Sequence, residues 1–296
     1  MTATTKTPVV VPTEIKESRF LKLPIYLTVG IVALLWTIPT LGLLINSFRE
    51  ARSIRSDGWW AILGNLFNSA TWSLENYRVV LEEGFGNAFV NTVAVTIPSV
   101  VIPITIAAFA AYAFSWMKFP GRNVMFVTVV GLMVVPLQMA LIPILRIYVD
   151  FNVNGTFPAA WLAHAGFGLP LAVYLLRNYM GSLPASLMES ANIDGADHFT
   201  IFYRLVIPLS VPVLASFAIF QFLWVWNDYL VALVFLGIEP NARVLTVELA
   251  DLAGRGEGAL SLLPAAAFVT MILPMVVFFS LQRFFVRGLT AGSVKG

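Results

Sequence analysis

The sequence predicts an all-α membrane protein with six transmembrane helices. Hydrophobic residues make up 58% of its 296 residues, charged residues make up 11%, and the mean hydropathy is +0.83. A soluble domain carries about 25% charged residues, because its surface must face water. A helix needs about 20 apolar residues to cross a bilayer, and the sequence contains six such runs, at residues 23–45, 88–115, 124–145, 159–176, 209–236 and 260–285. Continuous runs of this length exclude a membrane β-barrel, whose strands are shorter and alternate.

The segments between these runs predict which way the chain crosses the bilayer. Residues 1–22 form a polar tail, and no small-residue cleavage site follows the first run, so we expect this run to remain as an anchor. Of the 18 Lys and Arg residues, seven fall on one side of the predicted bundle, and the other side collects eleven, namely Lys6, Lys16, Arg19, Lys22, Lys118, Arg122, Arg177, Arg204, Arg283, Arg287 and Lys295. By the positive-inside rule, both termini are cytoplasmic.

The sequence offers no sign of catalysis or of a cofactor. It has no cysteine, which excludes disulfides and thiolate metal sites, and it has only two histidines. We expect His164, inside the fourth run, to be a hydrogen-bonded packing residue and His198 to be a solvated loop residue. No phosphate-binding loop, zinc-protease motif, nucleophile elbow or dinucleotide fingerprint occurs, so we expect no catalytic residues, no metal and no ATP hydrolysis by this chain.

The polar segment 181–208 (the 181–208 loop) lies between apolar runs but has the pattern of ordered structure. A helix is predicted to begin after Ser182 and to end where Gly195 supplies a turn, and a second helix capped by Asp194 follows. Two short helices at an angle form a compact projection. Glu189 offers an exposed carboxylate beside small residues, which suits docking into a groove of another protein. Residue spacing leaves the alternative, an ordinary connecting loop, open.

The 181–208 loop resembles the EAA loop of permeases from ABC importers. Glu189, Ala191, Gly195 and Pro208 match that pattern at the right spacing, whereas Ser190 replaces its middle alanine. The resemblance implies a cytoplasmic coupling helix that contacts an ATP-hydrolysing partner through Glu189, Ser190, Ala191, Asp194 and Gly195.

Further segments resemble the smaller permease of maltose-type carbohydrate importers, and the likeness runs from about residue 47 to residue 296. They include 74–77, 91–92, 110–114, 119–122, Pro136 with Gln138, 226–228 and the basic end 282–296. The resemblance implies a type-I ABC importer permease fold, in which residues 23–296 form one six-helix domain and the tail 286–296 reaches toward the ATPase subunits. It also implies a bacterial or archaeal cytoplasmic membrane as the location. The implied partners are a second permease, two ATP-binding subunits, an extracytoplasmic solute-binding protein and membrane lipid, with no nucleic acid.

Polar residues in the fifth run are candidates for the solute pathway. An aspartate inside an apolar span costs about 3 kcal/mol on insertion scales unless it meets a partner or water. Asp228 therefore either lines the pathway or ties two helices together. We place Trp226, Asn227 and Asp228, with Gln138 of the third run, along the pathway. The resemblance implies a sugar, such as an oligosaccharide or α-glucoside, and indole rings and amides suit a sugar's ring faces and hydroxyls.

Two other features predict the shape and the outer surface. Six prolines in four runs (Pro98, Pro103, Pro136, Pro143, Pro170 and Pro274) predict helices that bend around a pathway. The three tryptophans of the segment 46–87 predict a surface helix at the headgroup layer. The acidic segment 237–258 predicts a surface for a soluble outer protein.

Two alternatives remain open. The same machine could carry another solute, such as a glycerol phosphate, although that would predict more cations in the spans than this sequence has. A secondary transporter acting alone would need a relay of buried acids or histidines, and the spans offer one Asp and one His in different runs.

Overall fold

The computed structural model of the chain describes residues 19–64 and 72–290, and within them every regular element is a helix. Four segments are each long and apolar enough to cross a membrane: α1 (Arg19–Ser47), the continuous run of α3 (Glu75–Val80), η3 (Leu81–Phe85) and α4 (Gly86–Trp116), α7 (Phe157–Gly181), and α14 (Leu263–Thr290). Two bent helix pairs bring the number of spans to as many as six. The predicted all-α class and number of spans are confirmed.

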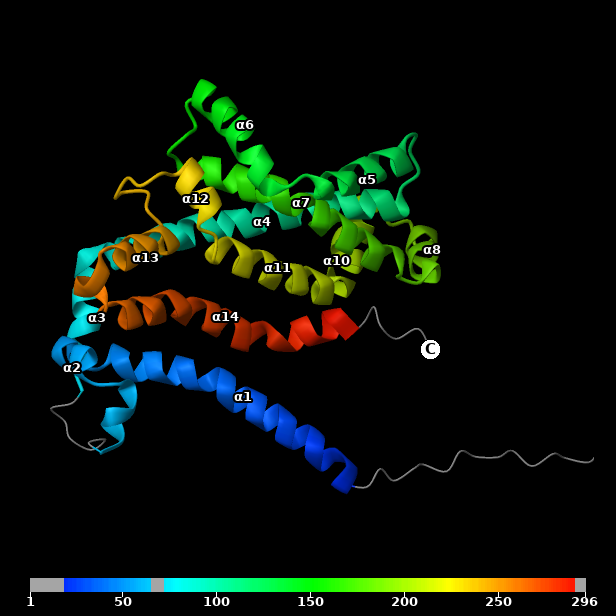
Figure 1. Cartoon of the computed structure of the whole chain (residues 1–296). Coiled ribbons are helices and arrows are strands. Elements are labelled where there is room, and N and C mark those ends of the chain that lie inside the picture. The colour runs from blue at the N-terminus through cyan, green and yellow to red at the C-terminus, as the bar shows by residue number, and fades with distance from the viewer. Residues whose placement is uncertain (1–18, 65–71, 291–296) are drawn as a thin grey trace, which may run out of the picture.

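The α4–α7 pair is the centre of the bundle, and small residues allow these helices to approach closely. Ala107 and Ala111 of α4 and Ala172 of α7 have no exposed surface. Alanines at a membrane helix interface let backbones pack in van der Waals contact, which stabilises helix pairs where no hydrophobic driving force acts between them. Helix α11 (Val211–Trp226) packs against α4, α7 and α14. Figure 1 shows α14 lying between α11 and α1.

Gln221 ties the three central helices together by its side-chain amide. Its Nε2 donates to the carbonyl oxygens of Ser99 on α4 and His164 on α7, both at 3.2 Å. Gly168 makes room for this amide, because a Cβ there would lie 2.6 Å from Gln221 Oε1. The crossing of α4, α7 and α11 is therefore fixed by hydrogen bonds as well as by packing.

Helix α1 lies at the edge of the bundle and is attached mainly at its C-terminal end. Tyr77 Oη donates to Ser47 Oγ at 2.8 Å, and Asn76 Nδ2 donates to the Arg49 carbonyl at 2.7 Å. Most of the helix is exposed, with Trp36 at 81%. An exposed stripe of large apolar side chains is what a lipid-facing or partner-facing span requires. The connection after it contains α2 (Ala51–Ser56) and η1 (Trp59–Gly64), short helices where one surface helix was expected.

The third apolar run is broken, which corrects the expectation of one helix over 124–145. Its parts are α5 (Arg122–Gly131) with η4 (Leu132–Val134), and α6 (Leu137–Asp150), which meet at a bend of 102°. Val135 is extended, with φ −70° and ψ 115°, because the ring of Pro136 disfavours a helical conformation in the residue before it. The other five prolines lie inside helices that continue through them, so a proline coincides with a break at one of the six positions.

The fifth apolar run is also interrupted, which corrects the expectation of one helix over 209–236. The chain bends by 71° between α10 (Ile207–Leu209) and α11, and α11 ends at Trp226. After a break at 227–229, the short helix α12 (Leu230–Phe235) begins. The carboxylate of Asp228 accepts the Ala232 amide at 3.0 Å and so caps α12. This aspartate lies in the break between two helices.

The two ends of the molecule carry different elements (Figure 1). The start of α1, the end of α14 and α8 (Ala185–Ile193) lie at one end, and α2, α3 and α13 (Leu245–Gly254) lie at the other. At the α13 end, Arg255 joins Glu83 at 3.0 Å to Asp251 at 2.9 Å, and Arg243 meets Glu248 at 3.0 Å. The hydrogen bonds that Arg255 donates to Asp251 raise the pKa of Arg255 above its ordinary value.

The predicted tails begin as helix where the structure describes them. Helix α1 starts at Arg19, inside the segment expected as the tail 1–22, and α14 continues to Thr290, inside the segment expected as the tail 286–296. Residues 1–18 and 291–296 lie outside the described ranges.

Candidate functional site

The 181–208 loop contains two short helices, as predicted, but their first residues differ from the prediction. The first helix is α8, which begins at Ala185 after Pro184. Ser182 was expected to cap it. Instead, Ser182 Oγ donates to the carbonyl of Tyr179 at 2.7 Å and so finishes α7. Gly195 has φ +79°, a conformation that glycine adopts without strain, and it makes the sharp turn after α8.

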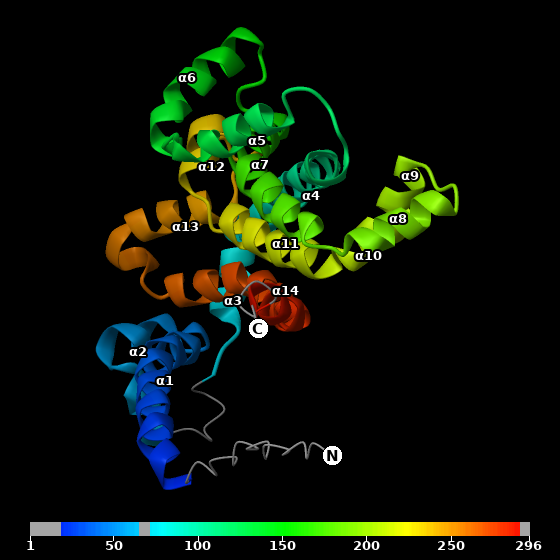
Figure 2. The ribbon, with the colours of Figure 1, turned by 90° about the vertical axis from the view of Figure 1, so that its right-hand side faces the viewer.

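The second helix is capped by Asp197, where Asp194 was expected. The Thr200 amide donates to Asp197 Oδ1 at 2.9 Å, and α9 (His198–Ile201) starts at the next residue. These hydrogen bonds from Thr200 lower the pKa of the Asp197 carboxyl. The π-helical turn η5 (Phe202–Val206) and α10 then return the chain to α11. Figure 2 shows α8 and α9 standing out to one side of the bundle.

The 181–208 loop presents a mixed polar and apolar face to solvent. Glu189, Ser190, Asp194 and Gly195 are exposed, Ala191 is half-buried, and Met188 is buried beneath them. Four large hydrophobic side chains share the exposed surface: Ile193 at 85%, Phe199 at 63%, Tyr203 at 56% and Leu187 at 38%.

Sequence reasoning did not assign these apolar side chains to a surface. Phe199, Phe202, Tyr203 and Val206 repeat at helical spacing, yet only Phe202 and Val206 are buried. Phe199 and Tyr203 point away from the core. The helical spacing shows that the segment 199–206 has two faces, but it does not show which of them packs against the bundle.

The second cluster of polar groups lies at the break between α11 and α12. Asp228 Oδ2 lies 3.7 Å from Nε2 of His164 on α7, and Thr246 Oγ1 donates to the Asp228 carbonyl at 2.6 Å. The Trp224 ring packs edge-on against His164, with ring centroids 5.3 Å apart. From the sequence, His164 was expected to be a hydrogen-bonded packing residue, and no pairing with Asp228 was predicted. His164 and Asp228 are rare ionisable residues within apolar runs. That rarity was the signal from which their pairing could have been predicted.

The four residues expected along the pathway have different surroundings. Trp226 is 1% exposed, and its Nε1 donates to the Thr270 carbonyl on α14 at 2.9 Å, so in this conformation its ring is a packing group rather than a solute contact. Asn227 is exposed and donates to Leu223 of its own helix at 2.7 Å. Gln138 is exposed in the first turn of α6, and no hydrogen bond within the described residues joins it to Asp228.

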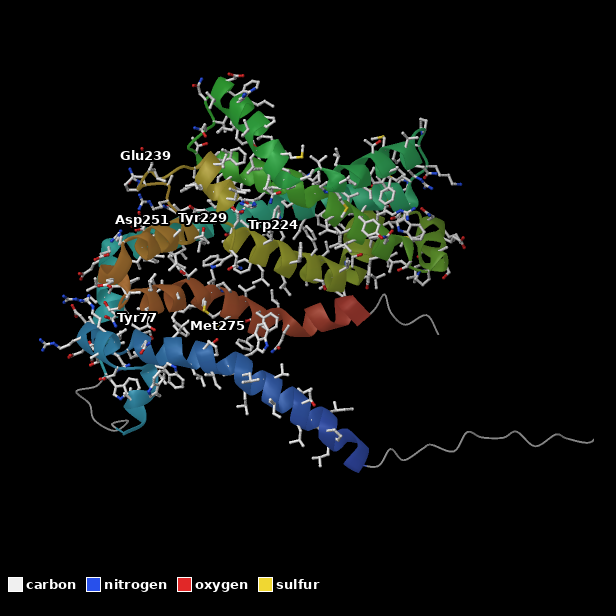
Figure 3. All side chains as sticks on the ribbon, viewed as in Figure 1. Tyr77, Trp224, Tyr229, Glu239, Asp251 and Met275 are labelled. Atoms are coloured by element: carbon white, nitrogen blue, oxygen red, sulfur yellow. The ribbon has the colours of Figure 1, made fainter. Side chains whose placement is uncertain are left out.

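A cavity of about 530 Å³ lies beneath the bend between α5 and α6. Its walls include Met133, Ile144 and Tyr148 from the bent pair, Gly166 from α7 and Trp224 from α11. Figure 3 labels Trp224 of α11 and Tyr229 at the end of the break, and Tyr229 is 42% exposed. Trp224 thus packs on His164, the neighbour of Asp228, and Tyr229 directly follows Asp228 in the chain, although neither ring was among the predicted pathway residues.

The chain is similar to one known protein family and to several known permeases. Residues 88–291 match the family described as "Binding-protein-dependent transport system inner membrane component". The osmoprotective compounds uptake permease of Synechocystis sp. is 51% identical over 95% of this chain and 94% of its own length. The alpha-glucoside transport system permease of Rhizobium meliloti is 43% identical over 92% of this chain and 97% of its own length.

More distant likenesses extend the same pattern. The melibiose/raffinose/stachyose import permease of Bacillus subtilis is 32% identical over 92% of this chain and 96% of its own length. In fold, the chain is similar to a chain of a bacterial ABC transporter involved in the import of the acidic polysaccharide alginate. The TM-score is 0.73 at 21% identity, covering 94% of this chain and all of that chain.

Proposed function

The chain belongs to the family of binding-protein-dependent transport system inner membrane components, and we propose that it works as one of two permease subunits in an ATP-driven importer. In this proposal the subunit forms the translocation path with a second permease. Two ATP-binding subunits hydrolyse ATP, and a soluble binding protein delivers the solute from outside. Both termini and the 181–208 loop face the cytoplasm, which the charge distribution supports.

The observation that carries this proposal is the exposed face of the 181–208 loop. Exposed aromatic and aliphatic side chains beside a carboxylate are typical of a docking surface, in which apolar anchors supply affinity and a charge pair supplies register. Ile193, Phe199 and Tyr203 are the anchors, and Glu189 is the charge that meets a partner cation. When the ATPase subunits close on nucleotide, they move this surface and rock the spans between inward-open and outward-open states.

A charge reversal tests the docking role. Glu189→Lys is expected to lower solute uptake and solute-stimulated ATP hydrolysis by at least tenfold, because two like charges would meet in the interface. The control is Glu50→Lys, which reverses an exposed carboxylate immediately before α2, and α2 lies at the end of the molecule opposite α8 (Figure 1). Unchanged uptake in Glu189→Lys would show that the loop is only a connector.

A crosslink gives a direct test of the same contact. The chain has no cysteine, so Glu189→Cys introduces a unique thiol into the subunit. In the assembled transporter this thiol is expected to crosslink to the ATPase subunit, and Glu50→Cys, beside α2, is expected not to do so. A complex that is intact but gives no crosslink from position 189 would contradict the proposal.

For the solute, we propose an α-glucoside or a small oligosaccharide. The alpha-glucoside permease and the melibiose/raffinose/stachyose permease support this class, as do the aromatic rings near Asp228. Asp228, Asn227 and Gln138 are the proposed polar contacts along the path. Asp228→Asn keeps the side chain's size and its cap on α12. It should preserve assembly while changing the relative uptake of different glucosides, as measured by competition against a labelled sugar.

A second solute class is supported by the relative with 51% identity, which is an osmoprotective compounds uptake permease. Uptake assays with the complete transporter should therefore include small osmoprotective solutes beside disaccharides. A glycerol phosphate is less favoured, since the spans carry almost no cations. Uptake by the purified chain alone, driven by an ion gradient with no ATPase present, would overturn the importer proposal.

A further inference from the structure

The 181–208 loop is attached to α4 as well as to its own flanking helices. Tyr112 lies near the end of α4 and is only 5% exposed, and its hydroxyl lies 2.9 Å from Nδ1 of His198 at the start of α9. His198 was expected to be a solvated loop residue. His198 is exposed, but its Nδ1 forms a hydrogen bond with Tyr112 of α4.

Aromatic packing strengthens this attachment. Phe202 is 4% exposed and stacks on Phe109 of α4, with centroids 4.6 Å apart and ring planes 26° apart. Phe202 also meets the Tyr112 ring edge-on at 5.3 Å. Contacts of this kind contribute about 0.5–1.5 kcal/mol each beyond their buried area. Phe109 and Tyr112 of α4 therefore form an aromatic packing surface for η5, the segment that follows α9.

Hydrogen bonds join the end of α4 to α7, which precedes the loop, and join α7 to α10, which follows it. Trp116 Nε1 donates to the Met180 carbonyl at 3.0 Å, and Ser115 Oγ donates to the Arg177 carbonyl at 3.2 Å, so the last turn of α4 is bonded to the last turns of α7. Tyr179 Oη donates to the Leu209 carbonyl at 3.1 Å, which joins α7 to α10. The end of α4, the end of α7 and the loop thus form one connected body.

The chain is less regular beyond this body. The π-helical turn η5 precedes α10, and the 71° bend before α11 follows at Ser210. A π-turn and a bend are places where a helix can change direction with little loss of hydrogen bonding. A force on the loop is therefore passed to α4 and α7 through side-chain contacts, while α11 is connected through a bend.

We propose that Tyr112 and His198 are positioning residues that couple movement of the 181–208 loop to the α4–α7 pair. The inference rests on the proposed function, because it assumes that ATPase subunits move the loop. It adds a specific path for that movement. The Tyr112–His198 hydrogen bond, packed beside Phe202, makes the loop and the α4–α7 pair move together.

The test uses the complete transporter, with its second permease and ATPase subunits, in proteoliposomes with its binding protein. The measured quantity is the amount of solute transported per ATP hydrolysed. Tyr112→Phe and His198→Ala each remove the hydrogen bond and should lower this ratio about fivefold, the equilibrium factor for a net hydrogen bond of ~1 kcal/mol. His198→Asn places a polar atom near the position of Nδ1 and should restore most of the ratio. Tyr174→Phe, a half-exposed tyrosine of α7, is the matched control and should leave it unchanged.

A double-mutant cycle separates coupling from independent damage. If the two residues act through each other, Tyr112→Phe combined with His198→Ala should be no worse than either single change. Multiplied defects, a normal ratio in Tyr112→Phe, or loss of ATPase subunits from both purified variants would overturn the positioning role. Failure of the unchanged transporter to couple uptake to ATP would instead overturn the proposed function, and this inference with it.

Discussion

Single side chains of the 181–208 loop set the ends of its helices, and Asp197 is the clearest case. Its carboxylate accepts the Thr200 amide at 2.9 Å and starts α9 immediately before His198. An N-cap satisfies an amide that otherwise has no partner in the first turn of a helix. The position of His198 relative to Tyr112 therefore depends on this cap.

Removal of the Asp197 cap should loosen the start of α9. Asp197→Ala is expected to speed hydrogen exchange of the Thr200 amide at neutral pH, whereas Asp197→Asn, which keeps an acceptor, should exchange like the unchanged protein. Because the folded state lowers the pKa of this carboxyl below its ordinary 3.8, the cap contributes fully above that pH and is lost as pH falls through the lowered value. Equal protection in Asp197→Ala would show that the cap is dispensable.

Trp226 illustrates how a residue expected along the pathway can be structural. Its ring is buried between Phe89 and Phe222, and its Nε1 bonds α11 to α14. Trp226→Ala should destabilise the purified subunit by about 3–5 kcal/mol, the range for large-to-small changes in a packed core. The measurement is thermal unfolding in detergent. The neighbouring Asn227→Ala is the control and should change stability by less than about 0.5 kcal/mol, since its side chain bonds only its own helix.

Among the helices, the bent pair α5–α6 depends on one residue for its shape. Val135 is extended because Pro136 follows it, whereas Pro143 lies inside α6 without breaking it. The cavity that Trp224 lines exists because α6 turns away at this point. A change at Pro136 is thus expected to alter that cavity as well as the course of the helix.

Pro136→Ala should relax the bend. Spin labels on cysteines introduced at Asn123 and Ile147 of this cysteine-free chain would report the distance across it. The distance should shift toward ~36 Å, the length of a straight helix between these positions at 1.5 Å per residue. Pro143→Ala is the matched control and should leave the distance unchanged. An unchanged distance in Pro136→Ala would mean that contacts with α7, and not the proline, hold the bend.

The molecule as a whole has two chemically different ends joined by apolar helices. Cations outnumber acids around the end that holds α8, and the carboxylates of α13, paired with the arginines that flank this helix, lie at the other end. Glu239 lies at the α13 end, opposite α8 (Figure 3). This polarity supports the proposed orientation.

Thiol labelling in intact cells tests that orientation. A cysteine at Glu239 should react with a membrane-impermeant maleimide from outside. A cysteine at Asn192 on α8 should react only after the cells are opened, because the 181–208 loop is proposed to face the cytoplasm. Labelling of position 192 from outside would contradict the orientation and the ATPase contact together.

The sequence predicted well those features that depend on local chemistry. Six apolar runs follow from the bilayer's need for about 20 apolar residues per span, and the left-handed turn at Gly195 follows from glycine's lack of a Cβ. The helix ends were predicted less well. Ser182 and Asp194 are good caps by residue type, but the chain uses Pro184 and Asp197, because the observed ends depend on how α7 and α4 position the loop.

The pathway residues show the same limit. Trp224 and Trp226 lie two residues apart on one helix, so their side chains point to different neighbours, and the sequence does not say which neighbours those are. The structure places Trp226 against α14 and Trp224 against His164. Asp228 was recognised as unusual, but its position in a break, opposite His164, depends on two spans that are far apart in the sequence.

Composition and residue spacing were therefore enough for the membrane-spanning class, the number of spans and the exposed carboxylate of the 181–208 loop, because each depends on solvent preference or on neighbours along the chain. The Tyr112–His198 bond, the meeting of Asp228 with His164, and the outward face of Phe199 and Tyr203 required the folded arrangement. Each of these joins or separates helices whose relative rotation is set by the packing of the whole bundle. The hydropathy of a single span does not determine how its helix is rotated relative to the others.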